Sequence, residues 1–143
     1  MKGKFWLIRN FSKFHGCLYR ISRGKIGTSI GKIQFVMLTT IGRKSGKKRT
    51  VPLASFHQDD EYVVIASYGG NSHHPAWFLN LRENPDVEIQ IDALITKAKA
   101  SIVEKHDSRY QELWKKATDT YHGFDNYQKA TSRSIPIVII KPC

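Results

Sequence analysis

Two segments of β character flank a short turn that is rich in glycine and in cations. Residues 33–41 and 49–57 contain many β-branched and aromatic side chains, which favour strands. Between them, Gly42 and Gly46 permit the backbone conformations of a tight turn, and residues 43–49 hold five cations within seven positions. The sequence therefore predicts a β-hairpin with a positively charged tip.

The tip of this hairpin, residues 42–49, is called the basic turn below. Amides exposed between two glycines can form a concavity that binds an anion, and the cations add attraction for a phosphate or a string of carboxylates. The basic turn lacks the Lys-Ser/Thr ending of a Walker loop and any G-x-G-x-x-G motif. Taken alone, a solvated basic loop is therefore the simpler interpretation.

Composition predicts a single globular domain over residues 1–143. The chain is 41% hydrophobic and 11% aromatic, which is enough to build a core at this length. Its formal net charge of +11 favours an acidic partner, which can be nucleic acid, anionic lipid or a polyanionic small molecule. Cys17 and Cys143 form no C-x-x-C pair, which is typical of a reducing cytoplasm, and no apolar run approaches the length of a membrane span.

The N-terminal part, residues 1–31, is predicted to be an amphipathic helix followed by a loop. Within residues 5–19, apolar side chains recur at helical spacing, with cations on the other side. The helix is expected to cover one end of the core. The alternative is a basic helix that lies on the inner face of a membrane. Residues 22–31 have no periodicity and are expected to be a loop.

The remaining elements indicate an α+β protein built on a small barrel. Further strands are expected at residues 61–68, 87–91, 94–104 and 135–140, and helices at residues 76–83 and 110–121. Pro136 indicates either an edge strand or a strand start. Residues 121–131 are aromatic but irregular. About six mostly antiparallel strands, an N-terminal helix and two further helices result.

No set of catalytic side chains stands out. His73 and His74 are adjacent but have no Cys, Asp or Glu at ligand spacing, so no metal site is expected. The sequence has no G-x-S-x-G elbow, and its paired carboxylates sit in one hairpin turn. A flat, anionic cofactor explains the basic turn, the Gly69-Gly70 pair and the aromatic side chains better than a catalytic set does.

An ordered series of motifs resembles one known family. The motifs are Leu38-Thr39-Thr40-Ile41-Gly42-Arg43-Lys44-Ser45-Gly46, Arg49-Thr50-Val51-Pro52-Leu53, Ala66-Ser67-Tyr68-Gly69-Gly70, Pro75-Ala76-Trp77-Phe78-Leu79-Asn80-Leu81, Asn84-Pro85 and Ile135-Pro136-Ile137-Val138-Ile139. In this order they are similar to the deazaflavin-dependent nitroreductases. The resemblance covers most of the chain from about Phe35 onward, and the N-terminal segment matches only loosely.

The resemblance implies a split β-barrel like that of FMN-binding oxidoreductases, and an oxidoreductase that passes a hydride from the reduced 5-deazaflavin coenzyme F-420 to a quinone, nitroaromatic or enone. The anionic phosphate and oligoglutamate tail of this coenzyme would be held by Arg43, Lys44, Ser45 and Arg49. The deazaflavin and its ribityl chain would be lined by Thr50, Val51, Pro52, Leu53, Ala54, Ile65, Ala66, Ser67 and Tyr68. The ring would be covered by Ala76, Trp77, Phe78, Leu79, Asn80 and Phe124. The substrate would contact Trp77, Tyr121 and Tyr127, with Tyr121 or Ser67 as proton donor.

Two positions depart from the pattern of the family. Tyr68 replaces the usual Lys or Arg before the double glycine, and Phe124 replaces a tyrosine of the nitroimidazole-reducing members. These departures argue against nitroimidazole reduction, whereas coenzyme binding is still expected from the resemblance. Alternatives are an FMN-dependent oxidoreductase or a flavin- or tetrapyrrole-binding protein on the same barrel, and a nucleic-acid-binding module, although the cations are not interleaved with aromatic residues. A monomer and a homodimer both remain open.

Overall fold

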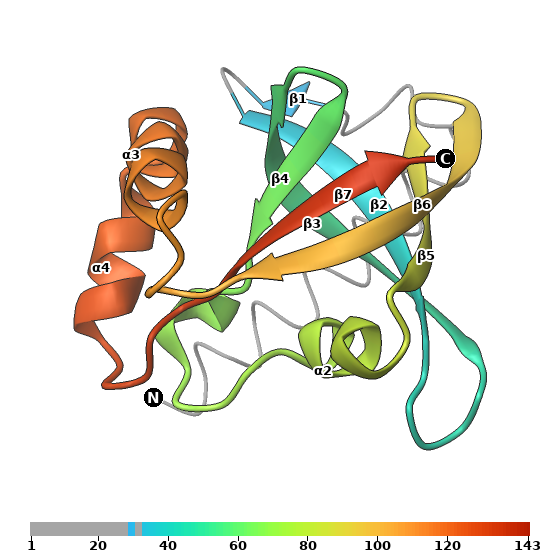
Figure 1. The fold of residues 1–143 in the computed structure, drawn as a ribbon, viewed down its shortest axis with the longest axis horizontal. Helices are drawn as coiled ribbons and strands as arrows, with labels where there is room; N and C mark the ends of the chain where they lie inside the picture. The colour runs from blue at the N-terminus through green and yellow to red at the C-terminus, as the bar shows by residue number, and fades with distance from the viewer. Residues whose placement is uncertain (1–28, 31–32) are drawn as a thin grey trace.

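The predicted hairpin is present in the computed structural model, which describes residues 29–30 and 33–143. Strand β2 (Ile33–Ile41) pairs antiparallel with β3 (Lys48–Gln58), from Gln34 opposite Ser55 to Ile41 opposite Lys48. The basic turn projects beyond this pair, at the lower right of Figure 1. The glycine-flanked turn therefore sits at one end of the molecule.

The described strands form an antiparallel sheet that closes on itself. The others are β1 (Ser29–Ile30), β4 (Glu61–Ile65), β5 (Asp86–Ile91), β6 (Leu94–Val103) and β7 (Ile137–Pro142). The strand order is β1-β2-β3-β4-β7-β6-β5, and β5 also pairs with β2, which closes the barrel (Figure 1). The predicted barrel is confirmed.

Within the described ranges, three α-helices and one 3-10 turn accompany the barrel. Helix α2 (Ala76–Glu83) lies at the lower end of the barrel in Figure 1, and α3 (Tyr110–Thr120) and α4 (Gly123–Lys129) lie together beside it. The 3-10 turn η1 (Tyr68–Gly70) follows β4. None of the helices of the described residues is long and apolar enough to cross a membrane.

Two hydrophobic cores result from the alternation of side chains along the strands. One fills the barrel and the face of α2, and includes Leu38, Val64, Phe78 and Val138. The other lies between α3, α4 and the opposite face of β4 and β7, and includes Val63, Leu113, Phe124 and Ile139. Consecutive residues of β4, such as Val63 and Val64, therefore point into different cores.

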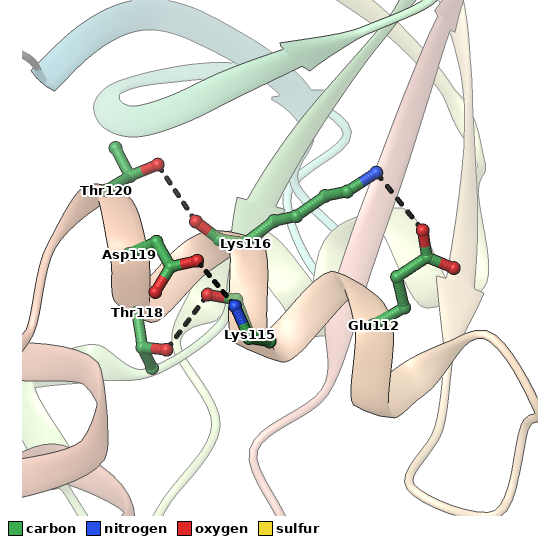
Figure 2. A network of polar contacts seen from close by, with 6 residues as sticks. All are labelled: Glu112, Lys115, Lys116, Thr118, Asp119 and Thr120. Carbon is green, nitrogen blue, oxygen red and sulfur yellow. Dashed lines mark hydrogen bonds and ion pairs between the residues drawn. The ribbon is translucent and has the colours of Figure 1, made fainter.

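Helix α3 exposes a polar face opposite this second core. Lys116 pairs with Glu112 at 3.3 Å and Lys115 with Asp119 at 3.1 Å, and the hydroxyl of Thr120 donates to the Lys116 carbonyl (Figure 2). Pairs four residues apart stabilise a helix by about 0.2–0.5 kcal/mol each when exposed. Lys116 also donates to Gln58 at 2.7 Å, which ties α3 to the end of β3. This face is a solvated helix surface.

Several boundaries differ from the sequence-based predictions. Residues 121–131 were expected to be irregular, but α4 occupies residues 123–129. The described residues therefore contain three α-helices, where the sequence predicted two beyond the N-terminal helix. A two-residue strand, β1, lies inside the predicted loop 22–31. Strand β4 ends at Ile65 because η1 begins at Tyr68. Pro136 precedes β7, which lies between β4 and β6, so the strand-start interpretation is correct and the edge interpretation is wrong. The predicted helix at residues 5–19 lies outside the described residues.

Candidate functional site

The basic turn is closed by its own hydrogen bonds. The Gly42 amide donates to the Lys47 carbonyl at 2.8 Å, the Gly46 amide donates to the Gly42 carbonyl at 2.8 Å, and the Lys47 amide donates to Ser45 Oγ at 3.2 Å. The amides of Gly42, Gly46 and Lys47 are thus engaged in hydrogen bonds within the turn. The cationic side chains of the turn are all exposed: Arg43, Lys44, Lys47, Lys48 and Arg49. Of these, Lys48 is paired with Glu88 at 2.9 Å.

Asn80 anchors the basic turn to helix α2. Its buried side-chain oxygen accepts from the Arg43 amide at 3.1 Å and from Arg43 Nη1 at 3.0 Å. Its Nδ2 donates to the buried Thr40 hydroxyl at 3.1 Å. Asn80 was predicted to cover the cofactor ring. In the structure its amide group is directed to the turn, which orients Arg43 and the start of the hairpin tip.

The predicted residues of β3 are divided between the two faces of the strand. Val51 and Leu53 pack against the core inside the barrel. Thr50, Pro52 and Ala54 alternate with them and point to the other face, where the Thr50 hydroxyl lies 2.6 Å from that of Thr39. All five side chains are half-buried. The outward three form a strip that runs from the basic turn towards α3.

The far end of this strip meets an aromatic cluster. A small hollow is lined by Ala54, Ser55, Phe56, Val63, Ile65, Thr120, Tyr121 and Phe124. The rings of Tyr121 and Phe124 are perpendicular, with centroids 5.2 Å apart, and the Tyr121 and Tyr127 hydroxyls are 3.0 Å apart. Burial and the hydrogen bond with Tyr121 raise the pKa of Tyr127 to about 12. The Tyr127 hydroxyl therefore stays protonated near neutral pH.

Gly123 makes room for the Tyr121 ring at the start of α4. A Cβ built on Gly123 would overlap the Cζ, Cε1 and hydroxyl of Tyr121. Only glycine therefore allows this ring to lie against the N-terminal turn of α4. The predicted residues Tyr121, Phe124 and Tyr127 are brought together by a helix that the sequence did not indicate.

The segment after β4 adopts a left-handed backbone over three residues. The φ angles are +46° at Tyr68, +62° at Gly69 and +82° at Gly70. A non-glycine residue in this region costs about 1–3 kcal/mol. Ala66 and Ser67 are buried, whereas Tyr68 is half-buried. The double glycine thus carries two of the three positive φ angles of this turn.

Most of the predicted residues on α2 belong to the core. Trp77 is 8% exposed and Phe78 is 1% exposed, and both pack in the barrel core. Leu79 is half-buried and Ala76 is exposed. Of these residues, only Ala76 is exposed, and Leu79 also packs against the barrel core.

The structure adds Arg133 to the candidate site, a residue that sequence reasoning missed. Its guanidinium lies within hydrogen-bond distance of the carbonyls of Ala66, Ser67 and Asn71. These partners are 62 to 67 positions away along the chain. No local pattern around Arg133 indicates such contacts.

Comparisons with known proteins show the family to which the chain belongs. The model of one protein family, described as F420H(2)-dependent quinone reductase, matches residues 11–142. The chain belongs to the F420H(2)-dependent quinone reductase family. An F420H(2)-dependent quinone reductase of Mycobacterium tuberculosis is 36% identical over 141 residues, which cover 94% of this chain and 95% of that protein. The predicted deazaflavin-dependent family is thereby confirmed.

Solved structures support the family and the fold. A structure titled F420-H2 dependent reductase is 36% identical, with a TM-score of 0.65 over 75% of this chain and 93% of that one. A structure described as a domain-swapped dimer is 30% identical, with a TM-score of 0.71 over 94% and 96% of the two chains. The heme storage protein HutZ of Vibrio cholerae shares the fold at 15% identity, with a TM-score of 0.60 over 89% of each chain.

Proposed function

We propose that this protein reduces a quinone with the reduced deazaflavin coenzyme F-420, which binds along the outward strip of β3. One observation carries the assignment of the site: β3 joins the exposed cations of the basic turn to the hollow beside Tyr121 and Phe124. Lys48 lies on the same face of β3 as Ala54, six residue steps away, which is about 20 Å of strand. An extended ligand with an anionic tail at one end and a flat ring at the other fits such a strip.

Each end of the strip would bind a different part of the coenzyme. At the basic turn, Arg43, Lys44 and Arg49 would attract the phosphate and the carboxylates of the tail, with Ser45 beside them. Along the strip, Thr50, Pro52 and Ala54 would contact the ribityl chain and the ring. At the hollow, Ile65 and Phe124 would exclude water from the ring. The bound coenzyme supplies the hydride that the quinone accepts.

The tyrosine pair would supply the proton. A quinone that receives a hydride needs one proton to become a hydroquinone. Tyr121 lies at the hollow, and its oxygen is 3.0 Å from the hydroxyl of Tyr127, which stays protonated. A hydrogen bond donated by Tyr127 would stabilise the oxygen of Tyr121 when Tyr121 gives up its proton. Ser67 is the second candidate donor, but its side chain is buried.

A fluorescence titration with oxidised deazaflavin coenzyme, run in parallel with FMN, tests the cofactor. Saturable binding of the deazaflavin that weakens as salt is raised supports the proposal, because the tail is held by exposed cations. Tighter binding of FMN than of the deazaflavin would instead indicate a flavin enzyme on the same barrel. Binding of neither ligand would refute the cofactor assignment, and nucleic acid would be tested next.

Turnover with a soluble quinone then tests the role of Tyr121. Tyr121→Phe is expected to lower kcat by about tenfold to a hundredfold, within the usual contribution of general acid catalysis. Tyr62→Phe is the matched control, since Tyr62 lies on β4 with its ring against His57 and the core inside the barrel. Equal kcat values in the two variants would exclude Tyr121 as the donor.

We further propose that the protein is a homodimer. A relative at 30% identity is described as a domain-swapped dimer. This supports a homodimer over a monomer for the present chain. Sedimentation equilibrium at several protein concentrations tests the point, and a single species with the mass of one chain would contradict it.

A further inference from the structure

Arg133 lies between α4 and β7 and joins backbone groups on both sides of the turn that follows β4. Its Nη2 donates to the Ser67 carbonyl at 2.9 Å and to the Ala66 carbonyl at 3.2 Å. Its Nε donates to the Asn71 carbonyl at 2.8 Å. One guanidinium therefore ties the residues before η1 to the residue after it.

The turn that Arg133 spans is strained and closely packed. Tyr68, Gly69 and Gly70 have positive φ angles in succession. A Cβ on Gly70 would lie 2.8 Å from the Cβ of Ala130 and 2.8 Å from the Tyr127 carbonyl oxygen, so η1 lies directly against the end of α4. Glycine adopts such angles without steric cost, so the strain falls on Tyr68. A strained residue of this kind persists only where its surroundings fix it, and such residues gather at functional sites.

Arg133 is itself held in place before any ligand binds. Gln128 on α4 donates from Nε2 to the Arg133 carbonyl at 2.8 Å and accepts from the Ile135 amide at 3.0 Å. Arg133 Nη1 lies 3.2 Å from His74 Nδ1. Because a guanidinium has only donors, this histidine nitrogen must be the acceptor. The backbone at Arg133 is thus fixed from α4, and its side chain is fixed from the loop before α2.

We propose that Arg133 is a positioning residue for the deazaflavin site, which fixes the turn that carries Ser67 and Tyr68. The inference rests on the proposed function. Without the guanidinium, the turn would populate its binding shape only part of the time, and the apparent Kd rises as the inverse of that fraction. Once saturated with coenzyme, the site is complete, so kcat should be retained. A residue that touches the reacting atoms would lower kcat instead.

Two variants and one control test this. Arg133→Gln removes the charge and the contacts with the carbonyls, and Arg133→Lys keeps the charge but cannot reach all of them. Arg109→Gln is the control, since Arg109 is exposed and its side chain binds Asp107. For each protein we would measure the deazaflavin Kd, kcat at saturating coenzyme, and hydrogen exchange of the Gly70 and Asn71 amides, which donate within the turn.

The expected result is a Kd raised about tenfold in Arg133→Gln, which corresponds to about 1.4 kcal/mol, and about threefold in Arg133→Lys. In both, kcat should stay within about twofold, and the two amides should exchange faster while those of β4 and β7 do not. If Arg133→Gln does not fold, the Kd and kcat of Arg133→Lys provide the test. A Kd equal to that of Arg109→Gln, or a loss in kcat without a change in Kd, overturns the inference. Absence of deazaflavin binding to the wild-type protein would refute the proposed function and the inference together.

Discussion

Replacement of Gly70 by alanine should destabilise the protein more than replacement of Gly46, although both glycines have positive φ angles. The angles are +82° and +71°, so a Cβ strains the backbone at either position. An alanine at Gly46 meets no atom within 4 Å, whereas one at Gly70 meets Ala130 and Tyr127 at 2.8 Å. The pair therefore separates backbone strain from the packing of η1 against α4.

The two terms set the expected magnitudes. Left-handed backbone costs an alanine roughly 1–2 kcal/mol, and this is the only unfavourable term expected at Gly46. Forcing a methyl group into a filled space adds about 1–3 kcal/mol at Gly70, for a total of about 2–5 kcal/mol. The entropy that alanine removes from the unfolded chain offsets both losses by a similar amount, so it cancels in the comparison.

Urea denaturation of the two variants and the wild type measures the difference. The midpoints should fall in the order wild type, Gly46→Ala, Gly70→Ala, with an unchanged slope. In thermal unfolding, a loss of 1 kcal/mol corresponds to roughly 3 °C at this chain length. Equal losses in the two variants would mean that the contact between η1 and α4 does not constrain the turn, and the packing argument would be wrong.

Three further predictions concern individual side chains. Tyr110→Phe should cost about 1–3 kcal/mol in urea denaturation, because the buried Tyr110 hydroxyl donates to the Ile135 carbonyl at 2.5 Å and phenylalanine removes this donor from a buried carbonyl; an unchanged midpoint would contradict this. Burial, then the charges of Arg133 and Arg82, lower the pKa of His74 below 6.5, with Glu104 opposing them. As the pH falls, His74 therefore takes up a proton at a higher pH in the unfolded chain than in the folded one. The contribution of His74 to the free energy of unfolding should be complete above about pH 6.5 and should decrease below that pH. The variant His74→Gln should show a smaller decrease, and a pH profile identical to that of the wild type would refute the role of His74. Gly123→Ala should displace the Tyr121 ring and lower quinone turnover while deazaflavin still binds; full turnover would show that the position of this ring is unimportant.

The sequence alone predicted the elements whose signals are local. Alternation and turn residues identified the hairpin around the basic turn, and Pro75 together with Asn84-Pro85 bounded α2. The barrel followed from the number of strands and their short connections. Helix α4 was missed because Gly123 and Asn126 are poor helix formers, and its stability comes from burial of Phe124 in the second core.

The candidate site was predictable only where a residue type signals its own chemistry. The cations of the basic turn and the tyrosines after α3 could be named without a structure. The role of Asn80 as an anchor for Arg43, and the contacts of Arg133, depend on pairs 37 to 67 positions apart. Such pairs are set by strand register and helix packing, which no local pattern contains.

The central place of β7 has a consequence for how the molecule forms. This strand pairs with β4 on one side and β6 on the other, yet it follows both in the chain, after α3 and α4. Until β7 docks, a nascent chain presents two open strand edges, and open edges readily pair with another polypeptide. Pairings between distant segments also slow folding. Docking of this one strand is therefore expected to set the folding rate, and the interval before it is when a growing chain is most exposed to association with its neighbours on the polysome.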